Sequence, residues 1–310
     1  MSHLTPEVVV VALSSRRRRV ARLDPATDYA EIHRNTVLHE FPWDMEVAAV
    51  AAQLRTLAVP RIGALLARTG EFRQRPQKRY DDTALLMEVP LVEGLDSVRG
   101  RTAFRRINEM HAMHDIEEGD LRYALATQVV VPARWIARHG WRALTAAELE
   151  ASINYHRHVA RRMHVPGLPT TYADLAALVD AHEREHFGHD PGARQVADAL
   201  LHLVAGFGPV GTHHLVHAAA LALMDPPLRE ALGYPDPGAG VRRATLAALR
   251  TRARTVALLP ARRRPRSLAG TARGRSYPAG FRVDRLGTFA PTCPVHRHSP
   301  EPPGRTAAVD

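Results

Sequence analysis

The amino-acid sequence predicts an all-α fold, both from the period of its apolar residues and from the patterns it lacks. Apolar residues recur three and four positions apart from about residue 25 to residue 258, which is the spacing of one helix face. No alternating run longer than a few residues indicates a strand, and the sequence carries no internal repeat. We therefore expect one helical domain at 25–258, preceded by an N-terminal arm at 1–24.

Capping residues place several helix boundaries. Asp44 is suited to begin a helix that runs to Leu57, because a carboxylate can accept from the free N–H groups of a first turn. Pro60 can begin the next helix, which Thr69-Gly70 ends. Thr145-Ala-Ala-Glu148 is a capping box that opens a helix to about residue 163. The most apolar helix is expected at 121–139, in the middle of the core.

The basic charge of the protein is concentrated in its C-terminal part. Residues 241–310 hold 15 basic and 3 acidic residues, whereas the chain as a whole has a net charge of +10. After about residue 259 the composition shifts to proline, arginine, glycine and serine. We predict a tail at 259–310 that is disordered or laid over the surface of the body. Attraction to nucleic acid or anionic lipid belongs to this tail and to the short run Arg16–Arg19, not to the nearly neutral core.

Cysteine content and N-terminal composition indicate the compartment. The single cysteine, Cys293, excludes an intrachain disulfide and fits a reducing environment. The apolar run at 8–13 is too short to span a membrane, and the charges around it fall on the wrong side for a secretory signal. We predict a cytoplasmic protein, and peripheral membrane contact stays open as an alternative.

A helix predicted from Ser97 onwards carries imidazole on its buried face. Phe104, Ile107, His111 and His114 share that face, and the charged residues, Arg106 among them, fall on the other sides. A buried imidazole either hydrogen-bonds a neighbouring helix or coordinates a ligand, because an unpaired buried nitrogen costs about 1–3 kcal/mol. On this helix alone, the hydrogen-bonded core histidine is the favoured interpretation.

Two other histidine-containing motifs could bind a metal. His182-Glu183-Arg184-Glu185-His186 matches H-E-x-x-H, in which histidines four apart on a helix chelate zinc and a glutamate activates water. No third ligand follows from the spacing, and the segment is polar on nearly all sides, as an exposed helix would be. Cys293-Pro294 is followed by His296 and His298, and here a turn is the favoured interpretation.

A third constellation combines Arg79, Asp82 and Thr83 with His111. Asp81, Asp82 or Thr83 is suited to cap a helix that follows the basic loop 73–79. Two consecutive helices with a short connection pack antiparallel, so the start of this helix can face the end of the next one, where His111 lies. A flat cofactor could lie between them, with the imidazole as an axial ligand and a cationic, hydroxyl-bearing edge above it.

Short motifs along the chain occur in an order that resembles a known family. They are Arg79-Tyr-Asp-Asp-Thr83, Asp96-Ser-Val-Arg-Gly-Arg101, Arg106-Ile-Asn-Glu-Met-His111, Gly119-Asp-Leu-Arg-Tyr123, Pro132-Ala-Arg-Trp135, Gly140-Trp-Arg142, Pro169-Thr-Thr-Tyr172 and, in the tail, Ser276-Tyr-Pro-Ala-Gly280. This set resembles the MpaB-type oxygenase family, which is related to the latex-clearing protein (rubber oxygenase). Apart from the tail motif, the likeness covers roughly residues 41–199.

The resemblance implies a fold, a cofactor and a site. It implies a globin-like all-α core that holds haem b non-covalently, with His111 as the axial ligand of the iron. It also implies an oxygenase that cleaves or oxidises a hydrophobic, isoprenoid-like carbon chain. In the latex-clearing branch an arginine is followed three residues later by a lysine and then a threonine. Arg79 and Thr83 match this pattern, but Asp82 stands at the lysine position, so we do not expect rubber itself to be the substrate.

From this resemblance we expect dioxygen to be activated at iron held by His111. Arg79 would stabilise negative charge on oxygen, Thr83 would donate a hydrogen bond, and Asp82 would move a proton. The apolar segments 121–136 and 196–224 would line the substrate site, and an unidentified electron donor could take part. Two alternatives from other classes stay open: a zinc hydrolase that uses the H-E-x-x-H motif, and a non-enzymatic helical module whose basic tail binds a polyanion.

Overall fold

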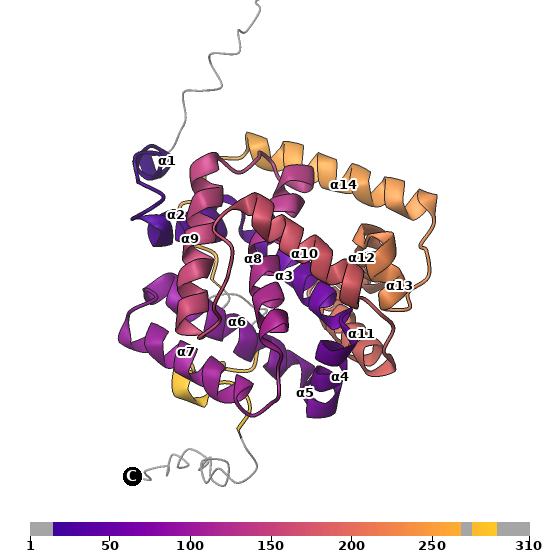
Figure 1. Ribbon diagram of the computed structural model, residues 1–310. Helices are drawn as coiled ribbons and strands as arrows, with labels where there is room; N and C mark the ends of the chain where they lie inside the picture. Colours follow the sequence, from indigo (N-terminus) through magenta and orange to yellow (C-terminus); the bar gives the residue numbers. More distant parts are fainter. Residues whose placement is uncertain (1–14, 268–274, 290–310) are drawn as a thin grey trace, which may run out of the picture.

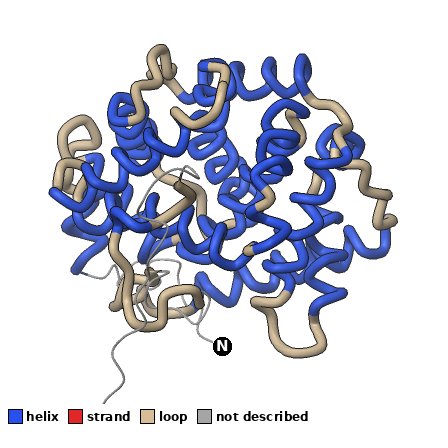
Figure 2. Tube along the Cα trace, turned by 90° about the horizontal axis from the view of Figure 1, so that it is seen from below, coloured by secondary structure: helices blue, strands red, loops and turns tan. Residues whose placement is uncertain are grey.

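The computed structural model describes residues 15–267 and 275–289 of the chain. All regular structure in these residues is helical and no strand occurs among them, which confirms the all-α prediction (Figure 1; Figure 2). The likeness to globins stays a prediction. The helices are α1 Ser15–Val20, α2 Tyr29–Asn35, η2 Thr36–Glu40, α3 Pro42–Leu57, α4 Pro60–Thr69, α5 Glu71–Gln74, α6 Pro76–Glu93, α7 Val98–His111, α8 Glu118–His139, α9 Ala146–Arg162, α10 Tyr172–His186, α11 Pro191–Ala205, α12 His213–Leu223, α13 Pro226–Ala231, α14 Ala239–Leu258 and η4 Val283–Arg285.

Helix α8 runs through the middle of the molecule, as its apolar sequence predicts (Figure 1). It contacts α3, α9 and α10. Tyr123 and Val130 of this helix are completely buried, and each such side chain contributes about 1.5–3 kcal/mol to the free energy of unfolding. Leu125 of α8 also belongs to the apolar cluster that contains Leu85 of α6 and Phe104 of α7, which links the site-bearing helices to this centre.

Two predicted helix signals are confirmed in atomic detail. Helix α4 ends where Gly70 adopts a left-handed conformation, with φ of 70°. Helix α9 begins with the reciprocal capping box, in which Thr145 Oγ1 accepts from Glu148 N at 3.1 Å and the Glu148 carboxylate accepts from Thr145 N at 2.9 Å.

Two predicted N-caps are wrong, and proline explains both. Helix α3 begins at Pro42 and helix α6 at Pro76. Proline suits the first position of a helix, because the N–H that it lacks would have no partner within the helix at that position. Asp44 therefore lies inside α3, where its carboxylate pairs with Arg252 at 2.9 Å. Asp81, Asp82 and Thr83 likewise lie inside α6 and are free to contact other segments.

Helix α7 also ends earlier than predicted. It stops at His111, so His114 is exposed in the turn that follows rather than buried on the helix face. Phe104 and Ile107 are buried as expected, at 3% and 6% exposed. Arg106, which was predicted to face away from the core, is buried too, because its guanidinium donates to the backbone carbonyls of Leu286 and Thr288.

The predicted tail contains a segment that joins the core. Residues 275–289, here called the C-terminal strap, lie over α6 and α7. Val283 and Leu286 of the strap are 4% and 0% exposed and pack with Phe104 and Ile107 in one apolar cluster. The strap is therefore neither disordered nor merely laid on the surface. The pair of motifs at Cys293 and at His296–His298 lies outside the described residues, as do residues 1–14 of the predicted arm.

No single helix within the described parts of the chain has the length and apolar composition needed to cross a bilayer. Helices α3 and α4 meet the criteria as a pair, but they bend by 102° where they join.

Two histidines are buried together between α2 and α9. The rings of His33 and His156 lie 5.2 Å apart, and both side chains are 5% exposed. Burial lowers the pKa of His156 to about 4, although its hydrogen bond to the Ser152 carbonyl acts in the opposite direction. Burial, together with His156, lowers the pKa of His33 well below its usual value.

These histidines predict a loss of stability in mild acid. The unfolded chain takes up a proton on His156 near its usual pKa of about 6.5, whereas the folded protein does so only near 4, so the folded state loses stability as pH falls through this window. Between pH 7 and pH 5, His156 should account for about 2 kcal/mol of that loss. Urea denaturation at the two pH values should show a smaller loss for His156→Gln than for the wild type; an equal loss would contradict this explanation.

Candidate functional site

Helices α6 and α7 form a tight hairpin whose geometry depends on glycine. Ser97 caps α7 by accepting from Gly100 N at 2.9 Å and donates to the Gly94 carbonyl at 2.9 Å. A Cβ at position 100 would overlap that same carbonyl oxygen. Gly94 has φ of 106°, a conformation that other residues rarely adopt. The Asp96–Arg101 motif therefore brings the two helices close together at their connection.

The hairpin places His111 near Arg79. His111 ends α7 and Arg79 lies in the first turns of α6, so the two helices run in opposite directions, as predicted. Burial, the positive charge of Arg79 and that of His114 lower the pKa of His111 to about 4. The imidazole is thus neutral at pH 7. No hydrogen bond to its ring is formed by any residue in the described ranges, which leaves a ring nitrogen able to act as a ligand.

Arg79 and Thr83 form a unit on one face of α6. The Arg79 guanidinium donates to Thr83 Oγ1, and the Thr83 hydroxyl donates to the Arg79 carbonyl at 2.9 Å. The guanidinium also lies over the Phe72 ring, 5.5 Å from its centre. Burial lowers the pKa of Arg79, against the influence of Asp82 and Glu71, yet an arginine stays protonated. No carboxylate within 15–267 or 275–289 forms an ion pair with it, so its charge can act on an anion.

Asp82 points to other partners. Its carboxylate is 3% exposed, pairs with Lys78 Nζ at 2.6 Å and accepts a hydrogen bond from the Tyr277 hydroxyl of the strap. Burial and this bond to Asp82 raise the pKa of Tyr277, which keeps its hydroxyl a donor. Both carboxylate oxygens of Asp82 are therefore occupied, one by Tyr277 of the strap and the other by Lys78 of the same helix.

Neighbouring Asp81 completes that attachment. It is fully buried, and its Oδ2 accepts from Ser276 N at 3.0 Å, from Ser276 Oγ at 2.6 Å and from Arg275 N at 3.1 Å. From the sequence we predicted no role for Asp81 beyond a helix cap, and none for Lys78 or Tyr277. The available signal was the Ser276–Gly280 motif, which stands out in a segment otherwise rich in proline and arginine.

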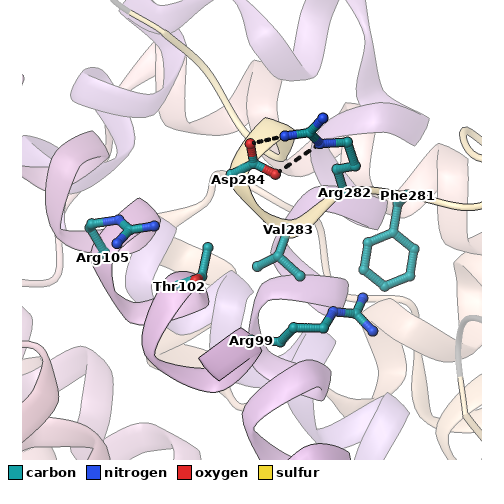
Figure 3. Close-up of a pocket in the computed structure, with 7 residues that line it drawn as sticks. All are labelled: Arg99, Thr102, Arg105, Phe281, Arg282, Val283 and Asp284. Carbon is teal, nitrogen blue, oxygen red and sulfur yellow. Dashed lines mark hydrogen bonds and ion pairs between the residues drawn. The ribbon is translucent and has the colours of Figure 1, made fainter. Parts of the chain in front are cut away.

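Two shallow pockets lie on the outer faces of α7. One, of about 430 Å³, is formed by α7 and the strap; its lining residues are Arg99, Thr102, Arg105, Phe281, Arg282, Val283 and Asp284 (Figure 3). The other, of about 480 Å³, lies between α7 and the end of α9 and includes Phe104 and Asn108. Neither is lined by His111 or Arg79. In the first pocket Arg282 already pairs with Asp284 at 2.8 Å, as Figure 3 shows.

The H-E-x-x-H motif has a structural role. Glu183 is 7% exposed; it pairs with Arg55 through both carboxylate oxygens and accepts from the Tyr123 hydroxyl at 3.1 Å. His182 stacks on Tyr123, and the nearby Asp120 carboxylate is held by both arms of Arg61. Across the described residues, no three histidine, cysteine, aspartate or glutamate side chains are arranged to hold a metal ion. The arrangement therefore does not support the zinc-hydrolase alternative.

The fold and the site together define a class of protein: an all-α protein with a neutral histidine and a desolvated arginine facing each other across a helical hairpin. The particular family follows from comparison of the sequence. Residues 43–258 match the family model described as ER-bound oxygenase mpaB/B'/Rubber oxygenase, catalytic domain. The chain belongs to this family, which confirms the resemblance drawn from its motifs.

Individual relatives come from Penicillium species. The ER-bound oxygenase mpaB' of Penicillium brevicompactum is 27% identical over 220 residues, which is 65% of this chain and 52% of the relative. The ER-bound oxygenase mpaB of Penicillium roqueforti is 34% identical over 125 residues, 38% of this chain and 42% of the relative. The matches thus span about half the length of these relatives or less.

The role assigned to Glu183 can be tested by its effect on stability. Glu183→Gln removes the charge from a buried ion pair and leaves Arg55, among the described residues, with the half-exposed Asp225 as its charged partner, so the free energy of unfolding should fall by about 3–5 kcal/mol. Glu185→Gln is the matched control, because that side chain is 74% exposed, and it should change stability by less than about 0.5 kcal/mol. Equal stability of the two variants would contradict the structural role.

Proposed function

We propose that the protein is a haem b-dependent oxygenase of a hydrophobic small molecule, with His111 as the axial ligand of the iron. The observation that carries this proposal is the neutral, unbonded imidazole of His111 beside the Arg79 guanidinium. Membership of an oxygenase family supports the reaction class. Since the matches cover only part of the relatives, activity and substrate are proposals for this chain.

The residues present fit a haem by the chemistry of their donors. A porphyrin supplies four nitrogens, so the protein needs to add only one or two ligands, and a neutral imidazole is a common one. Arg79 adds a cation that has no ion-pair partner among the described residues, and such a cation can stabilise an anion bound at the iron. The Phe72 ring, 5.5 Å from the guanidinium, supplies an apolar side chain beside it.

Bound there, haem would supply an iron at which dioxygen is activated. The chain's own residues then divide the remaining work. His111 holds the cofactor, and Arg79 stabilises negative charge, most strongly in a site from which water is excluded. Thr83 positions Arg79. Its hydroxyl accepts a hydrogen bond from the guanidinium and donates one to the Arg79 carbonyl.

Asp82 takes a different role in this proposal from the proton transfer suggested by the sequence. With Lys78 and Tyr277 on its two oxygens, it anchors the strap and holds the adjacent turn of α6 in place. We propose a lipophilic substrate, in keeping with the apolar faces of α8 and α11, and an external electron donor. The protein would act as an oxidoreductase in the cytoplasm or at a membrane surface.

Replacement of the proposed ligand tests the cofactor assignment. His111→Ala should lose most of its haem, measured as the Soret absorbance per chain after purification or reconstitution with haemin, because no other imidazole takes its place beside Arg79. His114→Ala is the matched control, since this exposed histidine lies only three residues further along, and it should keep full haem content. Full content in a folded His111→Ala protein, judged by circular dichroism, would refute the assignment.

The role of Arg79 can be tested without knowing the substrate. Arg79→Gln should lower the affinity of the holoprotein for azide, an anionic iron ligand, by about tenfold to a hundredfold, because a charge-assisted hydrogen bond is lost. Binding of neutral imidazole should change little. Arg73→Gln, which alters an exposed arginine of the preceding helix, should leave azide affinity unchanged. Parallel losses for azide and imidazole would indicate a collapsed pocket and contradict a charge effect.

A further inference from the structure

The outer side of α14 and the segment after it carry a concentrated positive charge. Residues 239–267 contain nine arginines and neither an aspartate nor a glutamate. Three of these arginines are paired with acids of the body: Arg242 with Asp236, Arg252 with Asp44, and Arg266 with Glu46. The remaining six are exposed and form no ion pair within the described residues; they are Arg243, Arg250, Arg254, Arg262, Arg263 and Arg264.

The positions of these arginines follow the helical period. Arg243, Arg250 and Arg254 are seven and four residues apart, so they lie along one face of α14. The opposite face packs against the body through Leu249, which is 8% exposed, and through Arg252. Figure 1 shows α14 along one edge of the molecule, away from α7. The charged face is therefore turned to solvent and is separate from the candidate site.

Two large apolar side chains are exposed at the end of the same helix. Leu258 is 87% exposed and Leu259 is 60% exposed, and Arg262–Arg264 follow after only two residues. The two leucines are adjacent in the sequence, so they expose one continuous apolar patch rather than scattered single side chains. Next to arginines they make up an amphipathic edge, with apolar anchors surrounded by cations.

Helix α1 extends this edge. Arg16 donates from its two terminal nitrogens to the carbonyls of Arg262 at 2.5 Å and Arg263 at 2.6 Å. These bonds fix the basic helix Ser15–Val20 beside the end of α14, in agreement with its place in Figure 1. Arg19 on α1 is 68% exposed even though it pairs with Glu31. Two basic segments more than 200 residues apart in the sequence thus meet on one side of the molecule.

We propose that this edge, formed by α1, the outer face of α14 and residues 258–264, docks peripherally on a membrane surface of anionic phospholipids. The arginines match the negative headgroups, and Leu258 and Leu259 insert at the boundary between headgroups and acyl chains. A nucleic acid would also attract the arginines, but its phosphate backbone offers nothing to two protruding leucines. The exposed leucines therefore favour a lipid surface.

Sedimentation with vesicles tests the docking surface. The full chain should bind vesicles of phosphatidylcholine with about 30% phosphatidylserine at least tenfold more tightly than phosphatidylcholine alone, and the affinity should fall several-fold as NaCl rises from about 50 to about 300 mM. A double variant, Leu258→Asp with Leu259→Asp, should lose at least tenfold in affinity. Arg262→Gln with Arg263→Gln and Arg264→Gln should lose the preference for phosphatidylserine.

A matched control separates this surface from general hydrophobicity. Val210 and Leu215, near the start of α12, are 106% and 70% exposed but have no such run of arginines beside them. Val210→Asp with Leu215→Asp should leave vesicle affinity within about twofold of the wild type. Weak binding of the wild type to anionic vesicles, or an equal loss in the control, would overturn the proposal. So would tight binding to RNA that the leucine variant retains. The assay measures binding alone, so its outcome is independent of the proposed oxygenase activity.

Discussion

The candidate site depends on the close approach of α6 to α7 at their connection. Gly100 has room for a hydrogen atom only, because the Gly94 carbonyl occupies the space that a side chain would need. Ser97 ties the same turn together through its two hydrogen bonds. With the connection held so tightly, α6 and α7 pack against each other, and the start of α6 lies near the end of α7. His111 and Arg79 meet for that reason, although 32 positions separate them in the sequence.

The strap supports this hairpin from outside. Two adjacent carboxylates of α6 accept hydrogen bonds from Ser276 and Tyr277. Arg106 of α7 donates hydrogen bonds to the carbonyls of Leu286 and Thr288. Between these polar contacts, Val283 and Leu286 enter the apolar cluster of the two helices. A segment at the end of the chain thus holds both halves of the site together. The hydrogen bonds to the strap also explain why Asp81 and Asp82 can be buried within one turn of Arg79.

Periodicity and capping chemistry were sufficient to predict the helices, the central position of α8 and the boundaries at Gly70 and Thr145. The same signals predicted helix starts wrongly at Asp44 and at Asp81 to Thr83. In the sequence, an aspartate that caps a first turn cannot be distinguished from one that binds a distant arginine or serine. Proline at position 42 or 76 was the decisive local signal. Long-range partners such as Tyr277 for Asp82 and Arg55 for Glu183 cannot be inferred from spacing, since nothing local specifies which distant segment arrives. The proximity of His111 and Arg79 was predictable, because the two residues lie on consecutive helices that are joined by a short connection.

The site and the proposed membrane surface lie on different parts of the molecule, so each can be probed alone. For the site, the most direct measurement is a titration of the purified wild-type protein with haemin, followed in the visible spectrum and quantified by pyridine haemochrome. The proposed function predicts saturation at one haem b per chain, with the spectrum of an iron ligated by histidine. A folded protein that shows no saturable binding would contradict the assignment of His111 as a haem ligand.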